Sequence, residues 1–475
     1  MRNATMLLVF AATVLAQKRP ITHEDVWLMK RTGAPTVSPD GKWAVMPVTE
    51  PSYDSAKTAS DLWIVPVDGS GPPRQLTHTL APETSAVFSP DSKRIAFATK
   101  REGDEFPQIY VLPLDGGEAM RIANVATGAS NPQWRPDGKA ILFESRVYPG
   151  AMTDEDNRKL AAERKARKYN TRVFDSFPVR YWDHWLDETR PHVFVQSLQE
   201  GAKPRDLLAG TKLAAQPGFE GAFSEEDTEL TPQWSPDGSS IVFAATADLN
   251  RLASAPFTTE LYRVPANGGE PAALTSGPDS YLHPVFRPDG KALYALRERS
   301  LQVSTYSLDR LVKIDWPETG QPKLLTGEWD RSVASIAFTP DSRTIYVTAE
   351  DQGHDKIFHL PADGGAVQPL FDAKDGTYSD LVIPSNARQP VLIARWQSML
   401  HPADVVRVNA TTGTNQFLTK FNDERIAQVD LPPPREFWIT AKSGRRIQSF
   451  VVLPPAFDPS KKYPRLCSPM ADRTA

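Results

Sequence analysis

Two segments of this 475-residue chain concentrate side chains that could bind a ligand. The first, VFDSFPVRYWDHWLDETRPH (173–192), surrounds Arg180 and Asp183 with aromatic residues, among them Trp182 and Trp185. Aromatic residues this dense in a connecting segment suit contact with a ligand or another domain, and they suit a small satellite core equally well. We treat Arg180, Trp182, Asp183 and Trp185 as candidate binding residues and keep both interpretations open.

The second segment, FSEEDTE (223–229), is acidic and contains Glu225 and Glu226. Neighbouring carboxylates could accept charge-assisted hydrogen bonds from a cationic group such as the free α-amine of a peptide. A solvated acidic turn would have the same composition and is the more common origin of such a run. Glu225 and Glu226 are therefore candidate binding residues with a structural alternative.

No stretch of the sequence has the spacing of a catalytic or cofactor-binding motif. There is no Walker-type phosphate loop and no Gly-x-Ser-x-Gly, and the eight histidines form no HxH or HExxH pair. Asp351, His354 and Asp355 lie close together, but a polar loop between two strands explains them at least as well as a metal site. We expect no metal, no cofactor and no catalytic residue in this chain.

One short motif, Pro-Asp-Gly or Pro-Asp-Ser before alternating apolar residues, recurs along the chain. Six copies begin at Val37, Phe88, Trp134, Trp234, Phe286 and Phe338, and a degenerate copy begins at Ile383. Proline presets φ, Asp caps its own backbone and Gly accepts positive φ, so each copy predicts a tight turn followed by a strand. Backbone turn geometry explains these Asp residues better than a functional carboxylate series does. The six are Asp40, Asp91, Asp137, Asp237, Asp289 and Asp341.

A second motif alternates with the first and predicts a strand, a turn and a short strand ending in Leu-Thr or a related pair. Its seven copies span 61–77, 108–123, 192–208, 260–275, 311–326, 356–371 and 404–419. The two motifs together give four antiparallel strands about every 50 residues. We predict an all-β fold, a seven-bladed β-propeller of TolB-like (WD40-like) repeats over residues 20–421. A flat β-sandwich array would not require seven matched copies.

The third repeat contains an insert of residues 146–191 between its second and third strands. Its first half, TDEDNRKLAAERKARKYN (153–170), has acidic residues early and basic residues late, which predicts a helix with a solvated charged surface. In an antiparallel meander, second-to-third loops and blade-to-blade connections emerge on the same face. We therefore expect the insert and the FSEEDTE segment to share one face of the propeller.

Charge and the amino-terminal segment bear on partners and location. The chain has 54 basic and 58 acidic residues without a basic stripe, which disfavours nucleic acid as a partner. Arg2, the apolar run 6–16 and the small residues before Gln17 predict a signal peptide over 1–16; an uncleaved anchor is the alternative. We expect an exported protein, periplasmic or secreted, that leaves the membrane after cleavage. Its single cysteine, Cys467, excludes internal disulfides.

The chain resembles the prolyl oligopeptidase family of serine peptidases over roughly residues 20–464, and most of all its acylaminoacyl-peptidase and dipeptidyl-peptidase-five-like branch. The resemblance rests on the propeller repeats, on RYWDHW in the insert, and on PPPREFWITAKSGRRIQSFVVLPPAFDPSKKYP (432–464). EFWITA and RIQSFVVLPP read as two strands around a Lys-Ser-Gly-Arg turn. In that family such a hairpin opens an α/β-hydrolase domain, and KKYP leads to the oxyanion motif.

This resemblance implies a peptide-cleaving enzyme whose propeller screens substrates by size and whose Ser–Asp–His triad lies on the hydrolase domain. None of the three triad positions occurs here, so we expect a substrate-gating propeller that is inactive alone and meets peptide substrates only beside a hydrolase domain. A TolB-like periplasmic propeller that binds a protein partner is the alternative. The hairpin at 435–454 favours the peptidase.

The pattern ends at Pro464, and the tail RLCSPMADRTA (465–475) has no periodicity. Its codons permit Val-Leu-x-His-Gly-Gly-Pro-His-Gly in a shifted reading frame, the kind of sequence the family places after KKYP. Paired glycines of that kind let backbone N–H groups approach an oxyanion. We interpret the tail as a frameshifted copy of the oxyanion strand, which the nucleotide sequence of the gene can test.

Overall fold

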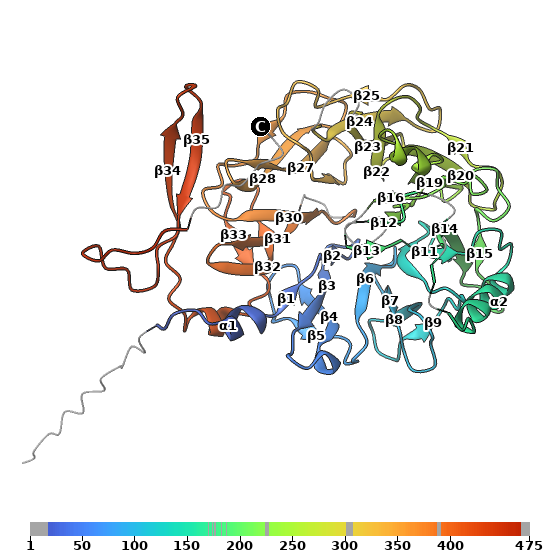
Figure 1. Cartoon of the computed structure of the whole chain (residues 1–475), viewed down its shortest axis with the longest axis horizontal. Helices are drawn as coiled ribbons and strands as arrows, with labels where there is room; N and C mark the ends of the chain where they lie inside the picture. The colour runs from blue at the N-terminus through green and yellow to red at the C-terminus, as the bar shows by residue number, and fades with distance from the viewer. Residues whose placement is uncertain are drawn as a thin grey trace, which may run out of the picture.

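Seven antiparallel sheets stand around a ring (Figure 1), as the repeats predicted. The computed structural model describes residues 18–169, 171–172, 174, 177–181, 183–186, 188–223, 228–300, 307–386 and 391–466. Within each sheet, strands that follow one another in the chain are neighbours, apart from loop insertions. The fourth strands β5, β9, β15, β21 and β25 lie at the rim in Figure 1, so each blade runs from the centre outward.

The strands of the first four blades are these. Blade 1 contains β1 (Arg31–Thr32), β2 (Thr36–Val37), β3 (Trp43–Glu50), β4 (Ala59–Pro66) and β5 (Arg74–Gln75); blade 2, β6 (Glu83–Phe88), β7 (Arg94–Thr99), β8 (Gln108–Pro113) and β9 (Met120–Arg121); blade 3, β10 (Ser130–Trp134), β11 (Ala140–Val147), β14 (Arg190–Ser197) and β15 (Arg205–Asp206); blade 4, β18 (Gln233–Trp234), β19 (Ser240–Ala245), β20 (Glu260–Pro265) and β21 (Ala272–Ala273).

The remaining three blades have four strands each. Blade 5 contains β22 (Ser280–Phe286), β23 (Ala292–Glu298), β24 (Arg310–Asp315) and β25 (Lys323–Leu324); blade 6, β26 (Ser335–Phe338), β27 (Thr344–Asp351), β28 (His354–Pro361) and β29 (Gln368–Pro369); blade 7, β30 (Thr377–Val382), β31 (Leu392–Ser398), β32 (His401–Val408) and β33 (Asn415–Phe417). A 3₁₀ turn, η1 (Ser55–Lys57), lies between β3 and β4.

The side-chain oxygens of the repeated Asp and Thr residues accept hydrogen bonds from backbone N–H groups in the turns and strands. In all six Pro-Asp turns the Asp carboxylate accepts the backbone N–H two residues later, at 2.9–3.2 Å, which confirms their structural role. In four blades the hydroxyl oxygen of the Leu-Thr threonine accepts a backbone N–H near the start of the third strand, at 2.8–2.9 Å. A buried N–H left without a partner is costly, so the Leu-Thr pair recurs for a structural reason.

Apolar side chains between neighbouring blades form the core. One cluster joins blades 2 and 3. It contains Ala96 and Ala98 of blade 2 and the rings of Phe143 and Phe194 of blade 3, which stack at 5.4 Å. Another joins blade 1 to blade 7 and includes Met46, Val65, Ile393 and Val405. Each blade therefore buries both faces against its neighbours, and closing the ring covers the outer faces of blades 1 and 7 as well.

Blades 1 and 7 share no strand, so the ring closes through side chains and the segments that flank the blades. Before blade 1 lies α1 (His23–Trp27), and after blade 7 lies α3 (Asp423–Ile426). Asn422 is buried and bonds both backbone groups of Lys30 at 2.9 Å. The backbone of Arg19 bonds Gln428 and Asp430 at 3.1 and 2.7 Å. These contacts fasten the two ends of the propeller to one another.

Beyond the ring, β34 (Arg435–Thr440) and β35 (Arg446–Val451) form a separate hairpin beside β28 in Figure 1. Gln448 Nε2 donates to the Gln352 carbonyl at 3.1 Å, at the turn between β27 and β28. Phe437, Trp438, Ile439, Ile447 and Phe450 are all more than one-third exposed on this hairpin. Two apolar strands with open edges present a surface for pairing or covering.

We predict that Asn422→Ala lowers the free energy of unfolding by about 2–3 kcal/mol, because two backbone groups of Lys30 lose their partner. Asn386→Ala is the matched control: Asn386 is exposed and bonds Pro39 at the same blade junction only through its backbone N–H, at 3.0 Å. Chemical denaturation of both variants measures the effect. Equal stability of the two variants would show that the Asn422 contacts do not close the ring.

Candidate binding face

The insert of blade 3 and the connection to blade 4 share one face, as the meander predicted. The β11–β14 ladder continues to the pair Val147 and Arg190, so the inserted loop is 148–189. Arg190 Nη1 lies 2.8 Å from Glu220 Oε2 in the connection, and Arg146 Nη2 lies 3.7 Å from Glu220 Oε1. Because Glu220 is only 2% exposed, these ion pairs fix the base of the insert against the connection.

The insert consists of a helix and a small hairpin. Helix α2 (Asp154–Lys165) begins with a capping box between Thr153 and Asp156; half of its residues are exposed and only Asn157 is buried, in agreement with the predicted solvated helix. The hairpin pairs β12 (Arg180–Tyr181) with β13 (His184–Trp185). In Figure 1, α2 lies at the rim whereas β12 and β13 lie toward the middle of the ring.

The structure brings three of the six candidate residues together. Arg180 and Trp185 are paired across β12 and β13, and Asp183 lies in the turn between them. Trp185 is 54% exposed and stacks on Phe174 at 5.8 Å. Trp182, Glu225 and Glu226 lie outside the described residues. The exposure of Trp185 favours a contact surface over a satellite core.

A hollow of about 190 Å³ lies on this face, next to the acidic segment. The connection between blades 3 and 4 contributes β16 (Ala222–Phe223), which pairs with β17 (Thr228–Glu229) around residues 224–227. The loop from β19 to β20, with the 3₁₀ turn η2 (Leu249–Ala253), and the ends of β22 and β23 complete the walls. The principal lining residues are Phe223, Leu252, Phe257, Leu282, Glu298 and Arg299.

Glu298 is the main charged feature of the hollow that sequence reasoning missed. Among the described residues its carboxylate has no hydrogen bond or ion pair, whereas the side chain of its neighbour Arg297 bonds Asp279 at 2.7 Å. Burial raises the pKa of Glu298, and burial followed by the Glu298 charge raises the pKa of Asp309 to about 6. A cation bound here would stabilise both carboxylates. In the sequence, Glu298 is distinguished only by its position as the last residue of β23, the second strand of blade 5.

The innermost strands are distorted near this face. Four of them shift register close to their first residues, where bulges bend a strand and redirect its side chains. The non-glycine residues with positive φ at the corresponding positions of five blades are Ser85, Asn131, Thr231, His283 and Asp380. Ser85 Oγ donates to Asn131 Oδ1 at 3.0 Å, which links two neighbouring blades. The centre of this face is therefore built by specific bulges rather than by regular strands.

Asp351, His354 and Asp355, which a polar loop explained at least as well as a metal site, lie where β27 turns into β28. Asp351 bonds Arg331 and Lys356, each at 2.8 Å, and His354 Nδ1 lies 3.1 Å from the Gly376 carbonyl. In the part of the chain that the structure describes, the one convergent set of metal-ligating side chains is His401, Asp404 and Asp423. No described helix has both the length and the apolar character needed to cross a bilayer.

Comparison with known proteins gives relatives for nearly the whole chain. A family model of the TolB β-propeller domain (PD40) matches residues 21–161. Dipeptidyl-peptidase 5 of Porphyromonas gingivalis is 27% identical over 449 residues, which cover 94% of this chain and 62% of that protein. Dipeptidyl-peptidase 5 of Porphyromonas endodontalis is 29% identical over 461 residues, 95% of this chain and 62% of that protein. The chain thus spans about three-fifths of the length of these relatives.

A solved structure shares the fold. An acylaminoacyl peptidase in complex with Z-Gly-Gly-Phe-chloromethyl ketone aligns with a TM-score of 0.66 over 93% of this chain and 60% of that chain. Its sequence identity is 16%, so the alignment supports the propeller architecture and not a common substrate.

A buried acid, Glu144, lies at the base of this face. Glu144 is 5% exposed; it accepts the Leu230 N–H at 2.8 Å and an Asn131 amide hydrogen at 3.3 Å. Burial raises its pKa from 4.5 to about 7. The folded state therefore keeps a proton that the unfolded state releases, and this group's contribution falls as pH rises from 4.5 to 7.

We predict that Glu144→Gln removes this component, on the order of 3 kcal/mol across that interval. Relative to the unsubstituted protein, the variant should become progressively more stable between pH 4.5 and pH 7.5. Urea unfolding of both proteins at a series of pH values gives the difference between their free energies of unfolding. The contributions of the other titrating groups cancel in this difference. Parallel pH profiles would show that Glu144 ionises normally in the folded protein.

Proposed function

Because the chain belongs to the prolyl oligopeptidase family, we propose that it is the propeller of an exported serine exopeptidase similar to the dipeptidyl peptidases. Its part in the reaction is to admit peptides and to hold their amino-terminal end on the face that carries the insert and the hollow. The Glu298 hollow is the observation that carries this proposal.

The chemistry of the hollow suits the first residues of a peptide with a free amine. The α-ammonium group would form a charge-assisted ion pair with Glu298, and it would relieve the repulsion between Glu298 and Asp309. Phe223 and Phe257, whose rings meet edge to face at 5.7 Å, offer an apolar wall for a side chain. Arg299 supplies a donor for peptide carbonyl oxygens on the same wall.

The size of the hollow favours the end of a peptide over a long internal segment. At about 190 Å³ it is smaller than the roughly 300–1,000 Å³ of sites that enclose drug-sized ligands. Glu225 and Glu226, which lie between β16 and β17 in the sequence, remain candidate carboxylates for the same amine. Arg180, Asp183 and Trp185 on the hairpin over the ring would contact the peptide farther from its amine.

The exposed hairpin suggests where the catalytic domain would dock. The turn that contacts Gln448 joins the second and third strands of blade 6, so the hairpin of β34 and β35 touches the same face that carries the insert. We propose that an α/β-hydrolase domain covers their apolar side chains and faces the hollow, so that the propeller limits access by size. The signal-peptide features of residues 1–16 support export to the periplasm or the medium.

We predict that Glu298→Gln weakens binding of a tripeptide with a free amino terminus about tenfold or more, because a charge-assisted hydrogen bond is lost. The same peptide with an acetylated amino terminus should bind the variant and the unsubstituted chain alike. Isothermal titration calorimetry measures both affinities. Glu118→Gln, an exposed acid in the loop between β8 and β9 on the opposite face, is the control.

Two results would contradict the proposal. One is equal loss of affinity for the free and the acetylated peptide in Glu298→Gln, and the other is no preference for the free amine in the unsubstituted chain. Either result would mean that the hollow does not recognise the peptide amine.

A further inference from the structure

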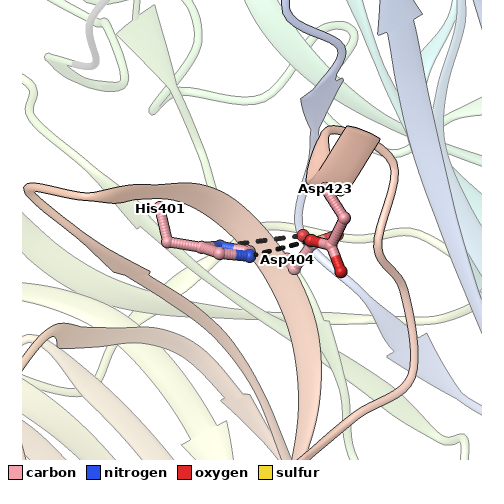
Figure 2. A group of neighbouring side chains, drawn as sticks. All are labelled: His401, Asp404 and Asp423. Atoms are coloured by element: carbon pink, nitrogen blue, oxygen red, sulfur yellow. Dashed lines mark hydrogen bonds and ion pairs between the residues drawn. The ribbon is translucent and has the colours of Figure 1, made fainter. Parts of the chain in front are cut away.

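Three potential metal ligands converge where blade 7 meets the segment that closes the ring (Figure 2). His401 and Asp404 belong to β32, and Asp423 is the first residue of α3. His401 Nε2 lies 3.2 Å from Asp423 Oδ1, and His401 Nδ1 lies 3.8 Å from Asp404 Oδ2. One ligand atom from each residue can be chosen so that all three lie within 4.8 Å of one another.

Asp404 contributes a buried carboxylate oxygen to this group. Its side chain is 0% exposed, and the Thr419 hydroxyl donates to Oδ1. Oδ2, the oxygen nearer to His401, has no hydrogen-bond partner among the described residues. A buried carboxylate oxygen without a donor is costly and requires an explanation. A cation shared by Asp404 Oδ2 and by His401 Nε2, the ring nitrogen that does not face Pro402, would supply the missing interaction.

His401 is held as metal-binding imidazoles are. Nδ1 lies 2.8 Å from the Pro402 carbonyl, so the tautomer that donates from Nδ1 leaves the lone pair of Nε2 facing Asp423. Metal-bound histidines typically donate their second ring nitrogen to a carbonyl or carboxylate in this way. Trp396 and Phe417 lie on the ring at 5.8 and 5.2 Å and restrict its rotation.

We propose that His401, Asp404 and Asp423 bind a divalent first-row transition-metal ion, most favourably Zn²⁺. One imidazole nitrogen and two carboxylate oxygens are ligands that Zn²⁺ accepts, with a water molecule as the fourth. Tetrahedral bonds of about 2.0–2.2 Å place neighbouring ligand atoms roughly 3.4 Å apart. The His401–Asp423 distance of 3.2 Å is already suitable, and the Asp404 oxygen, which lies within 4.8 Å of both other ligand atoms, needs a shift of about 1.5 Å.

The ion would strengthen the closure of the ring. Asp423 directly follows Asn422, which holds both backbone groups of Lys30 before blade 1. His401 and Asp404 lie in the third strand of blade 7. A metal ion shared by β32 and α3 therefore connects blade 7 to the clamp on the amino-terminal segment. This role is structural and independent of peptide binding at the hollow.

The test uses the purified chain, treated with EDTA, dialysed and titrated with ZnCl₂. We expect one equivalent of Zn²⁺ to bind, with a rise in the midpoint of thermal unfolding at saturation. His401→Ala and Asp423→Asn should each raise the Kd more than about 100-fold, beyond the usual effect of losing an outer-shell partner. Co²⁺ in place of Zn²⁺ should give the visible absorption of a tetrahedral site, which reports ligation without reference to stability.

His78→Ala is the matched control, because His78 is an exposed histidine in the connection between blades 1 and 2. It should bind Zn²⁺ as the unsubstituted chain does. If His401→Ala does not fold, the Asp423→Asn variant provides the test of metal binding. The Asp423 side chain is 44% exposed, and asparagine has the same shape as aspartate. The proposal is overturned if Zn²⁺ does not bind saturably, or if both variants bind it as tightly as the unsubstituted chain.

Discussion

The antiparallel order of strands within each blade is the constraint on which the rest of the structure depends. Successive strands reverse direction, so loops between second and third strands and connections between blades must leave the same face. The repeated Pro-Asp turns occupy the opposite face and cap their own backbones. One face is thus given to turn geometry, and the other is open to insertion. The insert of blade 3, the Glu298 hollow and the turn that meets the extra hairpin all lie on the open face.

Closure of the ring imposes a second requirement. Blades 1 and 7 come from opposite ends of the propeller sequence and share no strand, so their junction relies on an apolar cluster and on side-chain bonds such as Asn422 to Lys30. Other neighbouring blades are also joined covalently by a connecting segment. The blade 1–blade 7 junction is therefore where an additional link, such as an ion held by His401, Asp404 and Asp423, has the greatest structural effect.

The sequence predicted the fold well because turn chemistry repeats locally. Pro-Asp-Gly presets a turn wherever it occurs, so seven blades and the position of the insert followed from spacing alone. The binding residues were harder to predict, because the walls of the hollow come from three separate loops: Phe223, Leu252 and Glu298 lie far apart in sequence. For the same reason no local motif revealed His401, Asp404 and Asp423, whose ligands combine a strand with the helix after it.

Hydrogen–deuterium exchange with and without a free-amine tripeptide tests most directly whether one face receives the peptide. We expect slower exchange in segments 177–186, 218–223, 249–260 and 298–300, which contain the insert hairpin and the walls of the hollow. Exchange in the Pro-Asp turns at 39–42, 136–139 and 288–291 should not change. Protection of those turns, or equal protection of both faces, would contradict the assignment of the binding face.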